Sequence, residues 1–326
     1  MKSLNLFYKS QKPRHISAIK KSTVITSKQE PDVGEKNEKL RFDNLIITKR
    51  MRKSPFVRLF NKTPSNVICP HFYELILSNG CPFNCLYCYL KLTFRGNKNP
   101  VIFTNPWSQV EKELLKISKG VFSTGELADS LAVIPDLLEP AILWFSNQEG
   151  RYLLLTTKST NINFLRKFTP SSQVIVSFSI NSLKAWELFE KKTPSPLKRL
   201  ESAEKLKALG WRVRIRLDPV CLEVGLKDYE DICKRIKDLD PEVVTVGTLR
   251  HYPGLFRFEK QAPRKGLKKA PDGRMRYAEE ERLKAYETIA NWLGREPALC
   301  KETREVWEKL GWKFRVCNCT VIENGK

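Results

Sequence analysis

No stretch of the 326-residue sequence approaches the ~20 consecutive apolar residues of a membrane-spanning helix, and no signal-peptide hydrophobic segment opens it. We therefore expect a soluble, cytoplasmic protein without membrane contact. Nine cysteines in such a compartment argue against a disulfide framework and favour metal binding or catalysis. No internal repeat is apparent, and 41% hydrophobic residues suffice for one catalytic domain with extensions.

Acidic residues are scarce relative to basic ones. The chain has 36 Asp and Glu against 58 Lys and Arg, which gives a formal net charge of +22. A surplus of this size favours a polyanionic partner, and nucleic acid is the natural candidate. The alternative is a solvated basic surface, because charge alone identifies no ligand.

The basic residues concentrate in two places. Residues 1–29 carry seven Lys and Arg and no acid, and residues 257–276 carry eight against two acids. Because residues 1–45 lack sustained apolar periodicity, we predict a flexible basic arm there that could contact DNA. A transit peptide is the weaker alternative, since such peptides favour several arginines and only Arg14 occurs in the first 40 residues.

Three cysteines stand in a ten-residue stretch that reads Cys81-Pro-Phe-Asn-Cys85-Leu-Tyr-Cys88-Tyr-Leu. The Cys-x3-Cys-x2-Cys spacing places three thiolates on one loop, enough to hold three irons of a [4Fe-4S] cluster and leave the fourth open for chemistry. A structural zinc site needs four ligands, usually in two pairs, and no second Cys-x2-Cys or His pair follows at that spacing.

The cysteine spacing, with Tyr87 before the third cysteine, resembles the radical S-adenosylmethionine (SAM) motif. Within that superfamily, residues 87–90 are similar to the spore photoproduct lyase family, and further similarity runs from about Phe72 to His251. The resemblance implies a [4Fe-4S] cluster and SAM as cofactors and an electron donor such as flavodoxin or ferredoxin. It also implies a 5′-deoxyadenosyl radical that splits a thymine dimer in UV-damaged DNA.

Strand and helix patterns alternate along the middle of the chain. The predicted strands are 72–77, 120–123, 152–157, 174–179, 213–217 and 243–246, and the predicted helices are 107–118, 127–147, 196–210 and 226–239. Such alternation implies an α/β fold with a parallel sheet, either doubly wound or a barrel.

The cysteine loop favours the barrel, because reactive groups gather at the carboxyl ends of barrel strands and this loop follows the first strand. The resemblance likewise implies a radical SAM partial (β/α)6 TIM-type barrel, which we assign to residues 46–255. An irregular basic lead-in is expected at residues 45–70, where three prolines interrupt the chain. Residues 256–326 are predicted to form a basic loop and a C-terminal helical extension.

Residues that follow the predicted strands should line one cavity. After the second strand, Gly125 and Glu126 are similar to the radical SAM "GGE" segment that takes the ammonium of SAM, where a Glu offers a charge-assisted hydrogen bond. After the third strand, Lys158 matches a family lysine that pairs with the SAM carboxylate. An ordinary surface lysine is the alternative.

The fourth and fifth strands add further candidates. Ser179 and Asn181 belong to a segment that resembles the family's "FSIN" sequence, and the resemblance assigns both to SAM. Arg216 would face the barrel interior and need an anionic partner, either SAM, a phosphate or a structural pairing with Asp218. His251 aligns with a family turn, although a lone His is more often structural.

Two tyrosines are the catalytic candidates. Tyr87 and Tyr89 fill the positions of the tyrosines that, in the lyase, work with a cysteine to return a hydrogen atom to the product radical. That cysteine is absent, because none occurs between Cys88 and Cys221. Either Tyr89 quenches the radical alone, or Cys221 substitutes, or the substrate is different; buried packing is the alternative for Cys221.

Cys300, Cys317 and Cys319 suggest a second cluster only weakly, because they are scattered apart from one Cys-x-Cys pair. The prediction is a radical SAM enzyme that resembles spore photoproduct lyase and acts on UV-damaged DNA. One alternative is a radical SAM enzyme that modifies RNA, a peptide or a small molecule, which the missing cysteine favours. Another is a non-catalytic iron–sulfur protein that binds nucleic acid, against which Glu126, Lys158 and Ser179 count.

Overall fold

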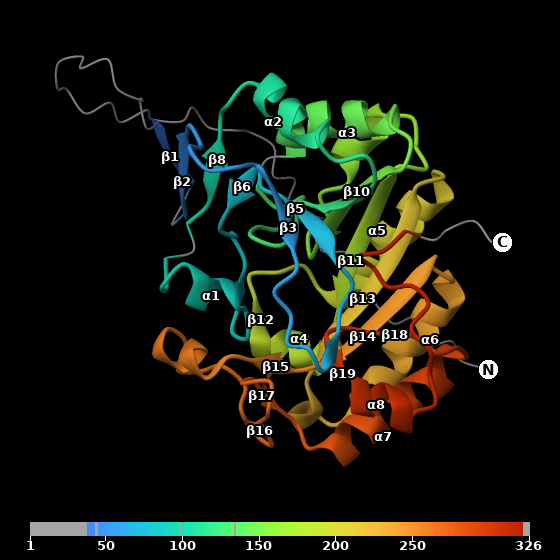
Figure 1. Ribbon diagram of the computed structural model, residues 1–326. Helices are drawn as coiled ribbons and strands as arrows, with labels where there is room; N and C mark the ends of the chain where they lie inside the picture. Colours follow the sequence, from blue (N-terminus) through green and yellow to red (C-terminus); the bar gives the residue numbers. More distant parts are fainter. Residues whose placement is uncertain (1–37, 43–44, 98, 134, 322–326) are drawn as a thin grey trace, which may run out of the picture.

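The computed structural model describes residues 38–42, 45–97, 99–133 and 135–321 (Figure 1). Most of the predicted flexible arm therefore lies outside the described residues. Its last part departs from the prediction, because Glu38–Phe42 forms strand β1, which pairs antiparallel with β2 (Leu45–Arg50). Among the helices of these four ranges, none is long and apolar enough to cross a membrane.

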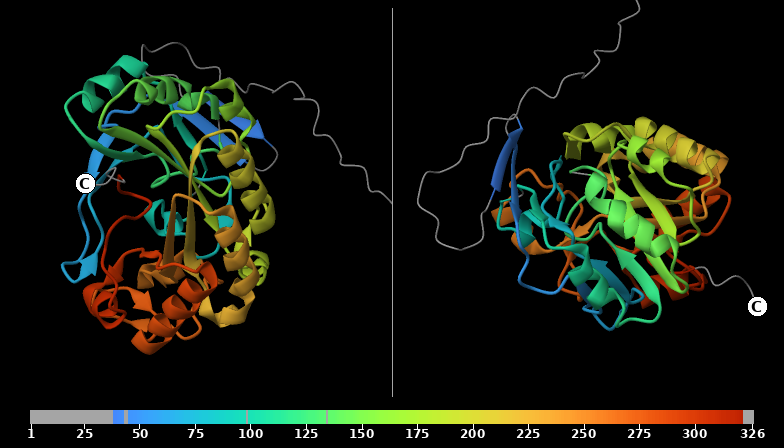
Figure 2. Two further views of the ribbon diagram at one scale, coloured as in Figure 1. Left: turned by 90° about the vertical axis from the view of Figure 1, so that its right-hand side faces the viewer. Right: turned by 90° about the horizontal axis from the view of Figure 1, so that it is seen from above.

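An eight-stranded curled sheet forms the centre of the protein (Figures 1 and 2). Six strands run parallel in sequence order: β5 (Phe72–Leu75), β9 (Gly120–Ser123), β10 (Arg151–Thr157), β11 (Val174–Ile180), β13 (Arg212–Val220) and β14 (Val243–Thr248). Antiparallel β3 (Val57–Phe60) and parallel β18 (Ala298–Leu299) form the two edges. The predicted partial α/β barrel is confirmed.

Burial explains why the middle strands are apolar throughout. Every residue of β11 and of β14 is buried, as expected for parallel strands covered on both faces. The outer face carries α2 (Trp107–Leu114), α3 (Glu139–Ser146), α4 (Leu183–Phe189), α5 (Pro196–Ala208) and α6 (Glu230–Leu239) (Figure 2). Helix α5 begins where the Ser195 hydroxyl accepts a hydrogen bond from the Lys198 amide, with Pro196 in the first turn.

All four predicted helices are shorter in the structure, three of them by four residues or more. The segment predicted as helix at 127–147 is a loop, then a 3-10 turn (Pro135–Leu138), and only then α3. The cause lies at Asp129, whose carboxylate accepts a hydrogen bond from the Leu131 amide at 3.1 Å and so stabilises a turn. Helix α6 likewise follows a 3-10 turn (Leu226–Tyr229), and α2 ends at Leu114.

The lead-in at residues 45–70 is more regular than predicted, because it contains β2, β3 and β4 (Val67–Ile68). Its strand β3 packs against the barrel: the Phe60 ring stacks on Phe72 of the neighbouring strand β5, with centroids 4.8 Å apart. Strand β2 pairs with β8 (Val101–Phe103), which pairs with β6 (Ser78–Asn79) just before the cysteine loop. This small sheet therefore braces the start of the loop.

Residues after β14 build one side of the molecule, as the orange and red ribbon of Figure 1 shows. They form β15 (Arg250–His251), a 3-10 turn (Pro253–Arg257), β16 (Lys268–Lys269), β17 (Met275–Arg276), α7 (Glu279–Leu293), β18, β19 (Glu302–Thr303) and α8 (Arg304–Lys309). The last described segment, residues 317–321, crosses the sheet. There the buried Arg214 donates hydrogen bonds to the carbonyl oxygens of Cys317, Asn318 and Thr320 at 2.7–3.1 Å.

Candidate active site

A cavity of about 490 Å³ opens where the parallel strands end. Ten of the eleven residues predicted for the site line it: Cys81, Cys85, Tyr87, Cys88, Tyr89, Gly125, Glu126, Lys158, Ser179 and Arg216. The exception is Asn181, which the structure places behind the cavity wall. The convergence follows from the topology, because the carboxyl ends of parallel strands meet at one edge of the barrel.

The three cysteines of the loop are free thiols on this wall. Burial raises the pKa of Cys81 and of Cys85, so both stay protonated near neutral pH until a metal replaces the proton. Three soft sulfur donors on one loop, with no fourth thiol of that loop beside them, fit a [4Fe-4S] cluster that keeps one iron open. The donor set therefore suits the group that the motif implies.

A short antiparallel strand pair fixes the cysteine loop. Strand β7 (Asn84–Cys85) pairs with β12 (Glu190–Lys191), which places Glu190 opposite Cys85. Next to this pair, the Leu86 amide donates a hydrogen bond to the Phe189 carbonyl oxygen at 2.8 Å. The loop then continues into α1 (Leu90–Thr93).

Glu190 is a site residue that the sequence analysis missed. Its side chain is fully buried, and its carboxylate accepts hydrogen bonds from the Tyr87 hydroxyl, the Asn181 amide (3.0 Å) and the Arg199 guanidinium. Burial alone would raise the pKa of Glu190, but Arg199 and Lys158 lower it to about 2. A permanent negative charge therefore lies beside the cysteine loop.

Lys158 lies between this charge and the cavity. Its ammonium is 3.5 Å from a Glu190 carboxylate oxygen and 5.9 Å from the centre of the Tyr87 ring. Asp129 holds the backbone here, because its carboxylate accepts hydrogen bonds from the Lys158 amide and the Thr157 hydroxyl, both at 2.6 Å. Burial raises the pKa of Asp129 despite these bonds.

The loop that carries Gly125 and Glu126 is closely packed. A Cβ atom at Gly125 would lie only 2.5 Å from the Cβ atom of Thr156 on the neighbouring strand β10. The Glu126 carbonyl oxygen accepts a hydrogen bond from the Tyr89 hydroxyl. Glycine is thus needed to let this loop lie flat against β10.

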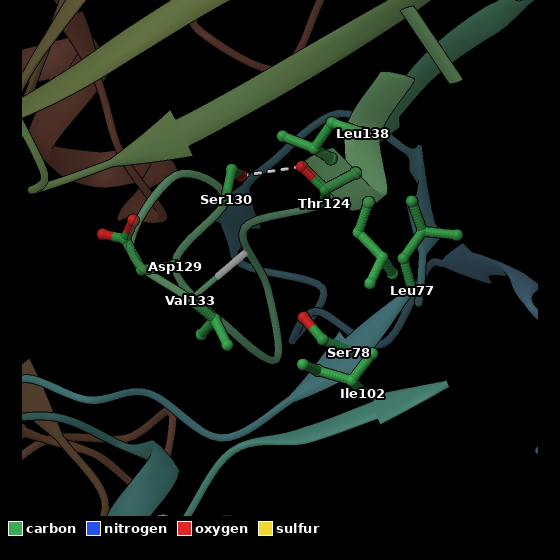
Figure 3. A pocket seen from close by; sticks show the side chains of 9 residues that line it. Leu77, Ser78, Ile102, Thr124, Asp129, Ser130, Val133 and Leu138 are labelled. Atoms are coloured by element: carbon green, nitrogen blue, oxygen red, sulfur yellow. Dashed lines mark hydrogen bonds between the residues drawn. The ribbon is translucent and has the colours of Figure 1, made fainter. Parts of the chain in front are cut away.

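A hydrogen bond of 2.7 Å between the Thr124 and Ser130 hydroxyls closes the same loop, and Figure 3 shows it beside a second, small cavity. That cavity has a volume of about 20 Å³ and borders Asp129, Leu77 and Ile102. It holds about one water molecule, too little for a substrate. The larger cavity is therefore the candidate active site.

Arg216 takes part in an ionic network. The Asp218 carboxylate accepts hydrogen bonds from Arg250 at 2.9 and 3.2 Å and from Arg216 at 3.3 Å. Burial would raise the pKa of Asp218, but these two guanidiniums hold it well below its ordinary value. The structural Arg216–Asp218 pair is present, and Arg216 also borders the cavity.

Two of the three scattered C-terminal cysteines contact Arg216, and the third contacts one of them. The Cys300 and Cys319 sulfur atoms lie 3.3 and 3.7 Å from the two terminal guanidinium nitrogens of Arg216, and the Cys319 amide donates to the Cys317 sulfur at 3.4 Å. The Cys317 thiol and Arg216 lower the pKa of Cys319 to about 7, although burial opposes them. Sequence separation concealed this cluster.

Three other candidates, Asn181, Cys221 and His251, lie in different surroundings. Asn181 is fully buried and does not border the cavity, and its side chain bonds to Glu190, the Ser182 amide and the Tyr229 hydroxyl. Cys221 is fully buried in the hydrophobic core and does not reach the cavity wall, so packing explains it. His251 does border the cavity, with its Nε2 atom 2.9 Å from the Pro263 carbonyl oxygen.

A partial parallel barrel with a Cys-x3-Cys-x2-Cys loop in the cavity at the ends of its strands defines a protein of the radical SAM class. The family model described as "Spore photoproduct lyase" matches residues 69–292, more than half of the chain. This chain therefore belongs to the spore photoproduct lyase family.

Curated relatives agree with that assignment. The chain is 27% identical to a spore photoproduct lyase of Clostridium acetobutylicum over 223 residues, which is 64% of each protein. It is 22% identical to that of a Geobacillus species over 253 residues (73% of this chain, 71% of the relative). The alignment thus spans just under two thirds of the Clostridium relative.

Solved structures share the fold. A spore photoproduct lyase complexed with dinucleoside spore photoproduct has a TM-score of 0.63 and 19% identity, with 78% of this chain and 80% of that chain covered. A mutant of a spore photoproduct lyase with bound AdoMet and dinucleoside spore photoproduct has a TM-score of 0.59 and 20% identity, with 71% and 76% covered.

Proposed function

We propose that this protein is a radical SAM lyase that repairs UV-damaged DNA. The observation that carries the proposal is the convergence of the three loop thiols, Glu126 and Lys158 on one cavity. Two structurally similar spore photoproduct lyases were solved with dinucleoside spore photoproduct, one of them also with AdoMet, which supports the same substrate and cofactor here. The net charge of +22 suits a nucleic-acid partner.

The chain's own residues take distinct roles in this proposal. Cys81, Cys85 and Cys88 would hold a [4Fe-4S] cluster, which when bound would supply the electron that cleaves SAM to a 5′-deoxyadenosyl radical. Glu126 takes the SAM ammonium, and Lys158 takes the SAM carboxylate. Ser179 and Arg216 complete the SAM side, whereas Asn181 acts only through Glu190.

The two tyrosines occupy different environments. Tyr87 is held inside by Glu190, and burial together with that carboxylate raises the pKa of Tyr87 well above its ordinary value, so the phenol keeps its proton. Tyr89 is 45% exposed and reaches the same cavity. With Cys221 buried in the core, Tyr89 is our candidate to return hydrogen to the product radical. A flavodoxin or ferredoxin in the cytoplasm would provide the electron.

The direct test is product formation from a defined lesion. Reconstituted protein should convert dinucleoside spore photoproduct to two thymidines in the presence of SAM and dithionite. The Lys158→Ala variant should lose this conversion and keep its iron. Unchanged dinucleoside after SAM has been consumed would refute the substrate assignment.

A radical SAM enzyme that acts on RNA is the second candidate. The missing cysteine between residues 121 and 130 favours it, because the hydrogen-return route of the lyase then lacks its usual donor. SAM cleavage stimulated by RNA and not by damaged DNA would select this candidate.

A further inference from the structure

Glu190 links the cysteine loop to the SAM side of the cavity. Its backbone pairs with Cys85 through β12 and β7, and its carboxylate accepts a hydrogen bond from the Tyr87 hydroxyl. The same carboxylate accepts a hydrogen bond from the Asn181 side-chain amide at 3.0 Å and lies 3.5 Å from the Lys158 ammonium. One side chain therefore contacts residues from three separate segments of the site.

Arg199 anchors Glu190 from behind. The Arg199 side chain is fully buried on α5 and donates hydrogen bonds to the Pro194 and Ser179 carbonyl oxygens at 2.9 and 2.8 Å. It also donates to the Thr193 hydroxyl at 2.9 Å, and that hydroxyl in turn donates to the Glu190 carbonyl oxygen at 2.8 Å. The carboxylate is thus fixed in one orientation by a partner that cannot leave.

The two cations beside Glu190, Arg199 and Lys158, lie on different sides of its carboxylate. Arg199 neutralises Glu190 from the side away from the cavity, whereas Lys158 lines the cavity and contacts Glu190 only at 3.5 Å. An anionic group in the cavity can therefore form an ion pair with Lys158, and Glu190 still keeps Arg199 as its partner. Without Arg199, an ion pair between Lys158 and that group would leave the buried Glu190 carboxylate without a cationic partner, which is costly.

We propose that Glu190 is the positioning residue that holds the cysteine loop and the SAM-binding side chains in register, and that its negative charge lowers the reduction potential of the cluster held beside it. The inference rests on the proposed function, because it assumes a cluster on Cys81, Cys85 and Cys88. Net charge near an iron–sulfur cluster is among the factors that set its potential. Partners that orient such ligands typically matter by about 10–100-fold.

The Glu190→Gln and Glu190→Asp variants separate charge from geometry. With Gln, the carboxylate charge is lost, and the cluster midpoint potential, measured by EPR-monitored titration without DNA, should move to more positive values. The KM for SAM should rise about tenfold or more, because Lys158 loses its partner. With Asp, the charge stays while the contacts lengthen, so the KM should rise and the potential should stay near that of the wild type.

Glu302→Gln is a matched control. Glu302 is also fully buried, also accepts hydrogen bonds from an arginine (Arg282) and from a tyrosine hydroxyl (Tyr286, 2.6 Å), and does not border the cavity. This variant should lose comparable stability but keep the wild-type potential and KM. A general effect of removing a buried carboxylate is thereby excluded.

The outcomes divide clearly. Iron-loaded Glu190→Gln protein with wild-type potential and wild-type KM would overturn the inference. If that variant takes up no cluster, Glu190→Asp decides, and a wild-type KM there would overturn it as well. Wild-type protein that binds no iron would overturn the proposed function itself, whereas SAM cleavage indifferent to DNA damage would change only the substrate.

Discussion

Gly125 offers a prediction that can be worked out from a single contact. In Gly125→Ala, the new methyl group would lie 2.5 Å from Thr156 Cβ and 3.1 Å from the Thr156 carbonyl oxygen. Carbon atoms in normal contact are about 3.5–4.0 Å apart, so the loop has to move by roughly 1 Å. Overpacking of this kind costs about 1–3 kcal/mol of unfolding free energy.

The displaced loop carries Glu126, which borders the cavity. The Glu126 carbonyl oxygen accepts a hydrogen bond from the Tyr89 hydroxyl. A misplacement of about 1 Å can cost about 100-fold in a catalytic parameter. We therefore expect kcat/KM for SAM cleavage to fall by about that factor, together with the stability measured by urea unfolding. Replacing Thr156 by Gly in the same protein should restore part of both.

Gly311→Ala is the control for a glycine substitution away from the site. Its φ of +67° makes a side chain strained, yet nothing lies within 4 Å of the added Cβ atom. Stability should fall and SAM cleavage should persist. Wild-type SAM kinetics in Gly125→Ala would refute the reasoning about this loop.

Three further predictions follow from the site. Replacing Cys81 by Ala should abolish SAM cleavage and lower bound iron, because two loop thiolates cannot fix a cube with one open iron; 5′-deoxyadenosine from a triple cysteine variant would contradict this. The pKa of Glu190 is about 2, against an ordinary value of 4.5, which corresponds to about 3 kcal/mol of folding stability. This contribution is present above pH 4.5 and is lost as the pH falls toward 2. Urea unfolding at pH 6 and pH 3 should show a smaller acid loss in Glu190→Gln than in the wild type. Joint replacement of Cys317 and Cys319 by Ser should leave about four irons per chain, because Arg216 lies between Cys319 and Cys300. A fall in bound iron from about eight per chain would instead establish a second cluster.

Local patterns predicted the alternating strands and helices, whereas the cysteine loop and the family resemblance indicated the barrel and ten of the residues that line the cavity. Val121 and Phe122 of the strand Gly120–Ser123 are apolar and buried as the sequence indicates, and the cysteine loop follows the first barrel strand. Lys158 and Ser179 reach the cavity because strand order alone brings the ends of neighbouring parallel strands together.

Long-range pairing explains what the sequence did not predict. Glu190 and Arg199 lie far from the cysteine motif in sequence, and nothing local distinguishes them from surface charges of amphipathic helices. Their roles arise when β12 pairs with β7. Asn181 was assigned to SAM by resemblance, but its strand end turns it toward Glu190 and Tyr229.

Packing in the last 70 residues was equally hidden. Cys300 and Cys319 both contact Arg216 only because β18 extends the sheet and the chain then returns across Arg214. The helix predicted at 127–147 begins late for a local reason, since the turn at Asp129 competes with helical hydrogen bonds. A side chain that bonds its own backbone is therefore a signal that apolar periodicity conceals.

The most direct test of the central claim is 5′-deoxyadenosine release from SAM. The protein would be reconstituted anaerobically with iron and sulfide, reduced with dithionite, and given UV-irradiated or unirradiated thymine-rich DNA. We predict that irradiated DNA stimulates the release and that Lys158→Ala abolishes it. Equal release with both DNAs would contradict the repair function, and no release from an iron-loaded protein would favour an iron–sulfur protein that only binds nucleic acid.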